Sequence, residues 1–190
     1  MSEPTSLRRA RPRICDEAAS PPWDGDGLPG LDRPDDRSVT EAGLRWSWYR
    51  FDELPPRTLY GILKLRQAIF IVEQNVAYAD IDGKDLTCAH LVCTFADEVV
   101  AYARAVPEGL FKPGAVSFGR VTVRHDLRRV GLGKALVARV LERIDTTRGA
   151  LPIEISSQYY LKTFYASFGF IAYGEQYIED QISHIAMRRA

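Results

Sequence analysis

The run Arg128-Arg129-Val130-Gly131-Leu132-Gly133-Lys134 has the composition of an anion-binding turn. Its two glycines let the backbone turn tightly with no side chain in the way. Where such a turn opens a helix, the unpaired N–H groups and partial positive charge of the helix end favour a phosphate or diphosphate. The flanking basic side chains add to that charge. The run therefore predicts a site for a phosphorylated cofactor, although it lacks the patterns of a P-loop and of a dinucleotide-binding turn.

The elements on both sides of this run are those that an anion-binding turn requires. Apolar residues over 116–123 predict a strand before it, and apolar residues spaced by four over 132–144 predict a helix after it. The order of the elements predicts one mixed α/β domain of the α+β kind over residues 44–190. One further helix is expected to open at Pro55-Pro56 and another to cover 159–168. Residues 73–86 are expected to form a loop that accommodates a short helix. The other expected strands cover 44–51, 89–95, 98–106, 152–156, 170–173 and 185–188.

The composition argues against several classes of protein. The formal net charge is zero, which argues against a nucleic-acid partner, and no apolar stretch reaches the ~18 residues of a membrane span. Three cysteines, Cys15, Cys88 and Cys93, include no CxxC pair, so we expect free thiols in the reducing cytoplasm. The aspartates within 80–85 lack the closing glutamate of a calcium loop, so we expect no metal.

Residues 1–43 differ in composition from the rest of the chain. They hold six of the eleven prolines, six arginines, nine acidic residues and only scattered apolar side chains. Such a segment buries too little apolar surface to offset its chain entropy, which predicts a disordered or loosely attached extension. A translation start nearer Leu44 is a second interpretation.

Two segments of the chain resemble motifs of the GNAT superfamily of N-acetyltransferases. The pyrophosphate loop of that family reads [Q/R]-x-x-G-x-[G/A], and Arg128, Gly131 and Gly133 stand at its defining positions. The segment from Phe164 to Phe170 is similar to the family's FYxxxGF segment. The element order over residues 44–190 is also similar, with the loop between the fourth strand and a long helix.

The ElaA-type branch of this superfamily resembles the chain more closely. The acyl-homoserine-lactone synthases share a similar early helix but match less well. The segments that carry the resemblance are Leu65-Arg66, Val72-Glu73-Gln74-Asn75, Tyr78 to Gly83, Val100 to Arg104, Phe118 to Val121, Glu179-Asp180 and His184-Ile185.

The resemblance implies acetyl-coenzyme A as the acyl donor and a primary amine of a small molecule or peptide as the acceptor. The fourth strand would offer backbone groups to the pantetheine arm, and the loop amides would receive the pyrophosphate. Gln158, at the end of the fifth strand, would hydrogen-bond the pantetheine or the acceptor, with Ser157 capping the next helix as the structural alternative. The implied cofactor-binding residues are Val121, Thr122, Val123, Arg128, Arg129, Val130, Gly131, Leu132, Gly133, Lys134 and Gln158.

Tyr165 is the candidate general acid implied by the FYxxxGF segment. A phenol and a thiolate have comparable pKa values, so the Tyr165 hydroxyl is suited to protonate the departing coenzyme A sulfur. The alternative is a tyrosine that packs its ring in the core with its hydroxyl at the rim.

The general base of an amine transfer has four candidates, Glu73, Asp80, Asp82 and His184, of which Glu73 and His184 are preferred. Glu73 follows an apolar helical run, so we expect partial burial and a raised pKa, with a solvated helix end as the alternative. His184 has a suitable unperturbed pKa, and its alternative is a structural role.

Five further residues are expected to bind the acceptor: Asp80, Asp82, Tyr102, Arg104 and Arg120. The two aspartates would meet its positive charge, and Tyr102 would stack on it or pack in the core. Arginine inside a strand is costly unless paired. Arg104 and Arg120 therefore either bind a carboxylate of the acceptor or form structural ion pairs with Glu73 or Asp80.

Three functions remain open from the sequence. The preferred one is direct acetyl transfer to an amine without a covalent intermediate. The others are a non-catalytic sensor of acyl-coenzyme A and an interaction module that uses the acidic tail. The expected partners exclude nucleic acid and membrane, and a homodimer is among the open oligomeric states.

Overall fold

The computed structural model describes residues 43–190, which belong to one compact unit. The predicted extension over 1–43 lies outside the described residues except for Gly43. No helix within 43–190 combines the length and apolar character needed to cross a membrane.

Four antiparallel strands in sequence order form the first sheet: β1 (Leu44–Arg50), β2 (Ala89–Phe95), β3 (Glu98–Val106) and β4 (Ser117–Val123). Strands β2 and β3 match the predicted ranges residue for residue. Their tight turn uses Ala96 and Asp97 with φ of 47° and 63°, as a two-residue hairpin requires. The register shifts between Tyr102 and Arg104 where β4 pairs with β3, and Arg120 has a φ of 53° there. This bulge turns the Arg120 side chain away from a regular ladder position.

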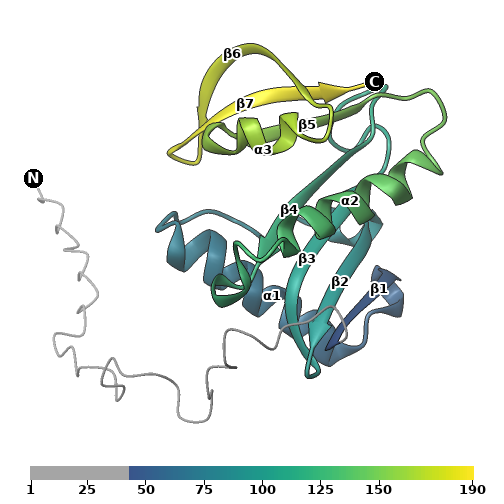
Figure 1. Cartoon of the computed structure of the whole chain (residues 1–190), viewed down its shortest axis with the longest axis vertical. Helices are drawn as coiled ribbons and strands as arrows, with labels where there is room; N and C mark the ends of the chain where they lie inside the picture. The colour runs from purple at the N-terminus through teal and green to yellow at the C-terminus, as the bar shows by residue number, and fades with distance from the viewer. Residues whose placement is uncertain (1–42) are drawn as a thin grey trace, which may run out of the picture. The chain divides into compact units, whose positions relative to one another are not determined.

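Helices cover both faces of this sheet (Figure 1). Helix α1 (Pro56–Arg66) continues into the π-helical turn Gln67–Glu73 and packs on one face with Val92 and Tyr102. Helix α2 (Leu132–Asp145) packs on the other face, against the strand residues that alternate with those two. Its apolar stripe includes Leu136, Val137 and Val140, which are fully buried.

The second sheet has the strand order β5–β7–β6 and is antiparallel. Its strands are β5 (Ile153–Gln158), β6 (Ile171–Glu179) and β7 (Ile182–Arg189), with the 3-10 turn Tyr159–Leu161 and helix α3 (Lys162–Ala166) between β5 and β6. Strands β6 and β7 are longer than predicted, because their hairpin turns at Asp180-Gln181, where both residues have positive φ. The helix predicted over 159–168 is observed as the 3-10 turn Tyr159–Leu161 followed by helix α3, which ends at Ala166.

The two sheets meet at one point and then separate. Val116 forms a parallel bridge with Ile153, and the Val116 N–H and C=O bond to Pro152 O and Glu154 N at 3.1 and 2.9 Å. Within the described chain β4 and β5 form no further ladder beyond this bridge. The backbone edges of the two strands are therefore left facing a gap, which side chains from both sheets line.

Candidate active site

A cavity of about 360 Å³ lies where β4 and β5 separate. Its walls come from both sheets and from the segment between α1 and β2. The lining includes Tyr78, Asp82, Lys84, Arg104, Gly119, Arg120, Val121, Ser156, Ser157, Gln158, Tyr165, Glu179, Asp180 and His184. The fold thus brings together candidates that are more than a hundred residues apart in the chain.

The loop before α2 presents a row of unpartnered backbone N–H groups. Among the described residues, no hydrogen bond is donated by the N–H groups of residues 129–134. Arg129 and Gly131 have positive φ (67° and 92°) on either side of Val130, an alternation that is typical of backbone anion nests. A Cβ placed on Gly131 would meet nothing within 4 Å, so the space beside the loop is open. These features fit a diphosphate held by backbone amides.

Arg128 is engaged differently from the prediction. Its guanidinium donates to both Glu73 carboxylate oxygens at 2.7 and 2.8 Å, and its Nε donates to Val123 O at 3.0 Å. The bidentate contact compensates the Arg128 charge, so Arg129 and Lys134 are the exposed basic side chains of the loop. Arg128 therefore fixes the loop to β4 and to the end of the π-helical turn.

The expectation of a partly buried Glu73 with a raised pKa is wrong. The hydrogen bonds from Arg128 lower the Glu73 pKa, and they outweigh the small effect of burial. A carboxylate with a lowered pKa that is held by a guanidinium is a poor proton acceptor.

The three predicted residues of β4 have different surroundings. Val121 lines the cavity. Thr122 is buried, with its Oγ1 3.4 Å from Tyr102 O, so its side chain lies inside the sheet. The Val123 carbonyl accepts a hydrogen bond from Arg128.

Gln158 lines the cavity at the end of β5. Its amide exchanges hydrogen bonds with Gln74 at 3.3 and 3.5 Å, and its oxygen accepts from the Tyr160 hydroxyl at 2.7 Å. Gln74 follows the π-helical turn, so this pair spans from that turn to the second sheet. Ser157 does not cap the following turn, since its hydroxyl donates to Gln158 O.

Tyr165 lies in α3 with its ring buried and borders the cavity. The ring packs edge-on against Phe164 and Phe170, with centroids 5.1 and 6.2 Å away. Burial raises the Tyr165 pKa, so the phenol keeps its proton at neutral pH. No hydrogen bond of its hydroxyl occurs among residues 43–190. A protonated phenol with no competing partner can act as a proton donor at the cavity.

His184 lies in β7 and lines the same cavity. Its Nδ1 is 2.9 Å from Ile182 O, and a carbonyl can only accept, so Nδ1 carries the proton of the neutral ring. The lone pair of neutral His184 is therefore on Nε2. The imidazole stacks on Tyr177 at 6.1 Å between centroids. This tautomer leaves His184 able to accept a proton.

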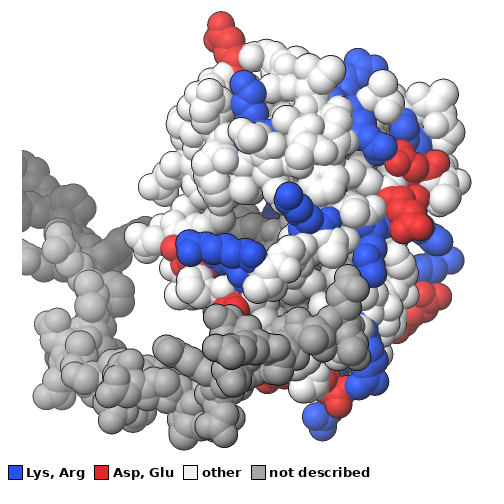
Figure 2. Space-filling view, in the orientation of Figure 1, with Lys and Arg blue, Asp and Glu red and all other residues white. Residues whose placement is uncertain are grey.

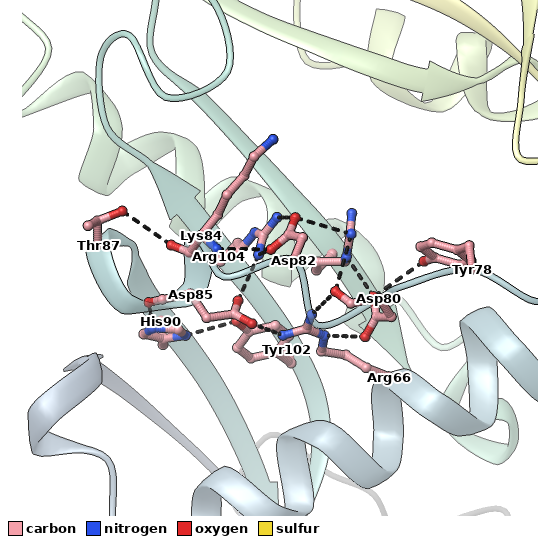
Figure 3. A network of polar contacts seen from close by, with 11 residues as sticks. Arg66, Tyr78, Asp80, Asp82, Lys84, Asp85, Thr87, His90, Tyr102 and Arg104 are labelled. Atoms are coloured by element: carbon pink, nitrogen blue, oxygen red, sulfur yellow. Dashed lines mark hydrogen bonds and ion pairs between the residues drawn. The ribbon is translucent and has the colours of Figure 1, made fainter.

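The predicted acceptor-binding arginines and aspartates form a buried ion network (Figure 3). Arg104 donates to both oxygens of Asp82 at 2.8 and 2.6 Å and to Asp85 at 2.8 Å. Arg120 donates to Asp80 at 2.7 Å, and Arg66 donates to Asp80 at 2.9 Å. The structural alternative for Arg104 and Arg120 is therefore the observed one, with aspartates as partners and not Glu73.

The two predicted aspartates are not free for an acceptor amine. Asp80 is buried and lies between two guanidinium groups. Burial alone would raise the pKa of Asp82, but the hydrogen bonds and charge of Arg104 more than offset it and hold the pKa below its ordinary value. Asp82 is therefore an unsuitable base as well. The three aspartates face arginines, and the part of the chain that is described contains no group of His, Cys, Asp or Glu suited to a metal ion.

Tyr102 is a core residue, which corrects the prediction of an acceptor contact. It is fully buried, and its hydroxyl lies 2.8 Å from His90 Nδ1. His90 Nε2 lies 3.0 Å from Asp85 O and must donate to that carbonyl, so the Tyr102 hydroxyl donates to Nδ1. Burial lowers the His90 pKa and raises that of Tyr102, which keeps both groups neutral.

Four residues of the site were not predicted as site residues from the sequence. Arg66 and Asp85 complete the ion network, and Lys84 and Glu179 line the cavity. Arg66 and Glu179 stand in segments that carry the family resemblance, which was the available signal for them. Lys84 carried no such signal, because a lysine in a polar loop is ordinarily a solvated side chain.

Charge is mixed over the visible face of the molecule (Figure 2). Basic and acidic side chains are interspersed where the described residues are seen.

The two separated sheets and the amide-lined loop together define a class of protein. A sheet that separates between its fourth and fifth strands, with an amide-lined loop leading into the following helix, is the acyl-coenzyme A N-acyltransferase fold. The family model described as "Acetyltransferase (GNAT) domain" matches residues 68–190. The chain belongs to the GNAT acetyltransferase family.

Similar proteins of known sequence and structure agree with this assignment. Protein ElaA of Escherichia coli is 41% identical over 149 residues, covering 77% of this chain and 96% of ElaA. The crystal structure of Escherichia coli ElaA superposes with a TM-score of 0.72 at 40% identity, covering 77% of this chain and 99% of that one. The crystal structure of an acyl-CoA N-acyltransferase from Pseudomonas aeruginosa has a TM-score of 0.72 at 36% identity, with the same coverage.

Proposed function

We propose that the protein is an acetyl-coenzyme A-dependent N-acetyltransferase that acts directly on a primary amine of a small molecule or peptide. The observation that carries the proposal is the row of unpartnered N–H groups over residues 129–134, in a chain whose separated sheets also place Tyr165 and His184 on one cavity. Membership of the GNAT family supports acyl-coenzyme A as the donor.

The donor would be held by the loop and by the edge of β4. Amides of Arg129 to Lys134 would bind the diphosphate, with Arg129 and Lys134 adding positive charge. Val121 and Gln158 border the cavity where a pantetheine arm would pass. When bound, the thioester supplies an acetyl group that is activated towards attack by an amine.

Two side chains would move the protons of the reaction. His184 Nε2 would accept the proton that the acceptor ammonium loses before the neutral amine attacks, because Nδ1 already donates to Ile182 O. The C–N bond would form, and the Tyr165 hydroxyl would donate a proton to the sulfur as the C–S bond breaks; the second proton that the nitrogen loses would restore the phenol. A backbone N–H of β4 would stabilise the oxyanion. We also propose a cytoplasmic location, which the free and buried thiols of Cys88 and Cys93 support.

The test is an acceptor screen with the full 190-residue chain and acetyl-coenzyme A. Release of free thiol that depends on an amine, together with the acetylated amine in the mass spectrum, is the expected result. Binding of coenzyme A without turnover on any amine would indicate an acyl-coenzyme A sensor instead. A chain that neither binds coenzyme A nor releases thiol would overturn the proposal.

A further inference from the structure

Lys84 is the one cavity-lining cation without an ion pair among residues 43–190. Arg104 and Arg120 also line the cavity, but each is paired with aspartates within 2.8 Å. The network of three arginines and three aspartates is neutral as a whole, so the ammonium of Lys84 adds an uncompensated charge to that wall. In Figure 3 the Lys84 side chain extends away from the network, and no contact joins its terminal nitrogen.

The backbone of Lys84 is fixed although its terminal nitrogen is free. Its N–H donates to Asp82 Oδ1 at 3.1 Å, and its carbonyl accepts from Thr87 Oγ1 at 3.2 Å. Asp82 is in turn held by Arg104. The ion network therefore sets where the Lys84 side chain leaves the backbone, while its flexible stem keeps the ammonium available to a ligand.

The second sheet contributes two acidic side chains to the cavity wall. Glu179 of β6 and Asp180 of the following turn both line the cavity and form no ion pair among the described residues. The Glu179 carboxylate accepts from Ser156 Oγ at 2.9 Å, and that hydroxyl is 2.6 Å from the Tyr177 hydroxyl. These contacts fix Glu179 without neutralising it.

We infer that the acceptor is an amine that also carries a carboxylate, as in an amino acid, with Lys84 binding the carboxylate and Glu179 binding the ammonium. The inference rests on the proposed function, because it names the acceptor class of the same cavity. One uncompensated cation and two uncompensated anions on different walls favour a ligand that bears both charges. The arginines expected from the sequence to bind such a carboxylate are already paired, and Lys84 takes that role.

The experiment compares amino acids with the amines left when their carboxylate is removed, such as phenylalanine with phenethylamine and lysine with cadaverine. The ratio of kcat/KM values within each pair isolates the carboxylate. In the wild type we expect the amino acid to be preferred about tenfold or more for at least one pair, as for a charge-assisted hydrogen bond. Lys84→Gln should bring that ratio close to one, and Lys84→Arg, which keeps the charge, should retain the preference.

Two further variants separate the roles of the walls. Lys64→Gln removes an exposed lysine of α1 that does not line the cavity, and it should leave the ratio at the wild-type value. Glu179→Gln should raise KM for both members of a pair, because both carry the ammonium, and should leave their ratio unchanged. Thermal unfolding of each variant checks that it is folded.

The inference and the proposed function fail in different ways. Turnover of amines with a ratio near one in the wild type, or a ratio that Lys84→Gln does not change, overturns the inference and leaves the proposed function standing. No turnover of any amine overturns the proposed function. Calorimetric titration with the same amino acids and amines needs no turnover, and equal affinity within every pair also overturns the inference.

Discussion

Replacing Tyr165 by Phe removes one hydroxyl and little else from the structure. The ring of Tyr165 packs against Phe164 and Phe170, contacts that phenylalanine keeps. The hydroxyl has no hydrogen-bond partner among the described residues, so its loss breaks no bond there. We therefore expect the free energy of unfolding to change by less than about 0.5 kcal/mol.

The chemical step should respond far more strongly. Loss of a positioned proton donor lowers a rate by about 10²–10⁴, which equals roughly 3–5 kcal/mol of transition-state stabilisation. Coenzyme A affinity should stay at its wild-type value, because the loop amides of residues 129–134 are unaffected. The predicted signature is a large fall in kcat with unchanged binding and stability.

Single-turnover measurement of acetyl transfer tests this prediction, since it separates chemistry from product release. Calorimetry with coenzyme A and urea denaturation give the binding and stability readouts. Tyr159→Phe is the matched control, because Tyr159 is exposed and does not line the cavity. A Tyr165→Phe variant that transfers acetyl at the wild-type single-turnover rate would remove Tyr165 from the mechanism.

Three further predictions follow from the geometry. Gly131→Val should weaken coenzyme A binding about tenfold or more by calorimetry. Gly149→Val also places a β-branched residue at a positive φ (60°, against 92° at Gly131) and should bind normally. Equal losses in both variants would refute a role for the loop. Asp85→Asn should lower the free energy of unfolding in urea by about 3–5 kcal/mol, because it leaves Arg66 and Arg104 without a shared buried partner; a loss below about 1 kcal/mol would contradict this. His184→Gln should lower kcat by about 10²–10⁴ and leave coenzyme A affinity unchanged; a wild-type kcat would exclude His184 as the base.

The stability of the wild type should fall as the pH is lowered from 7. Burial depresses the pKa of His90, so the stability it contributes is present above its unfolded value of about 6.5 and is lost below it. Arginine contacts outweigh burial and depress the pKa values of Asp82 and Asp85, whose contribution is lost below about 4. Thermal midpoints measured between pH 7 and pH 3 test whether the His90 contribution is lost before that of the aspartates. A midpoint that does not change with pH would contradict the prediction.

The elements with a strong local signal were predictable from the sequence, and the elements without one were not. Strands β2 and β3 are apolar runs, buried along most of their length, on either side of a two-residue turn, so their ends could be placed. Strand β6 is exposed along nearly all of its length, so its residues show no apolar alternation and the strand was predicted too short. The π-helical turn after α1 likewise has no sequence period that separates it from an α-helix.

The candidate site was predictable where the signal was local. The loop around Gly131 depends on neighbouring residues and on the helix that follows, and its position was foreseen. The partners of its side chains were not, because the contact of Arg128 with Glu73 joins residues 55 positions apart. The burial of Tyr102 likewise depends on how α1 packs on the sheet, which no local pattern encodes.

A crystal structure of the protein with coenzyme A tests the central claim most directly. We predict diphosphate oxygens within about 3 Å of backbone nitrogens in Arg129 to Lys134, with the sulfur directed into the cavity between β4 and β5. A diphosphate bound away from these amides, or a cofactor that lies outside that cavity, would contradict it.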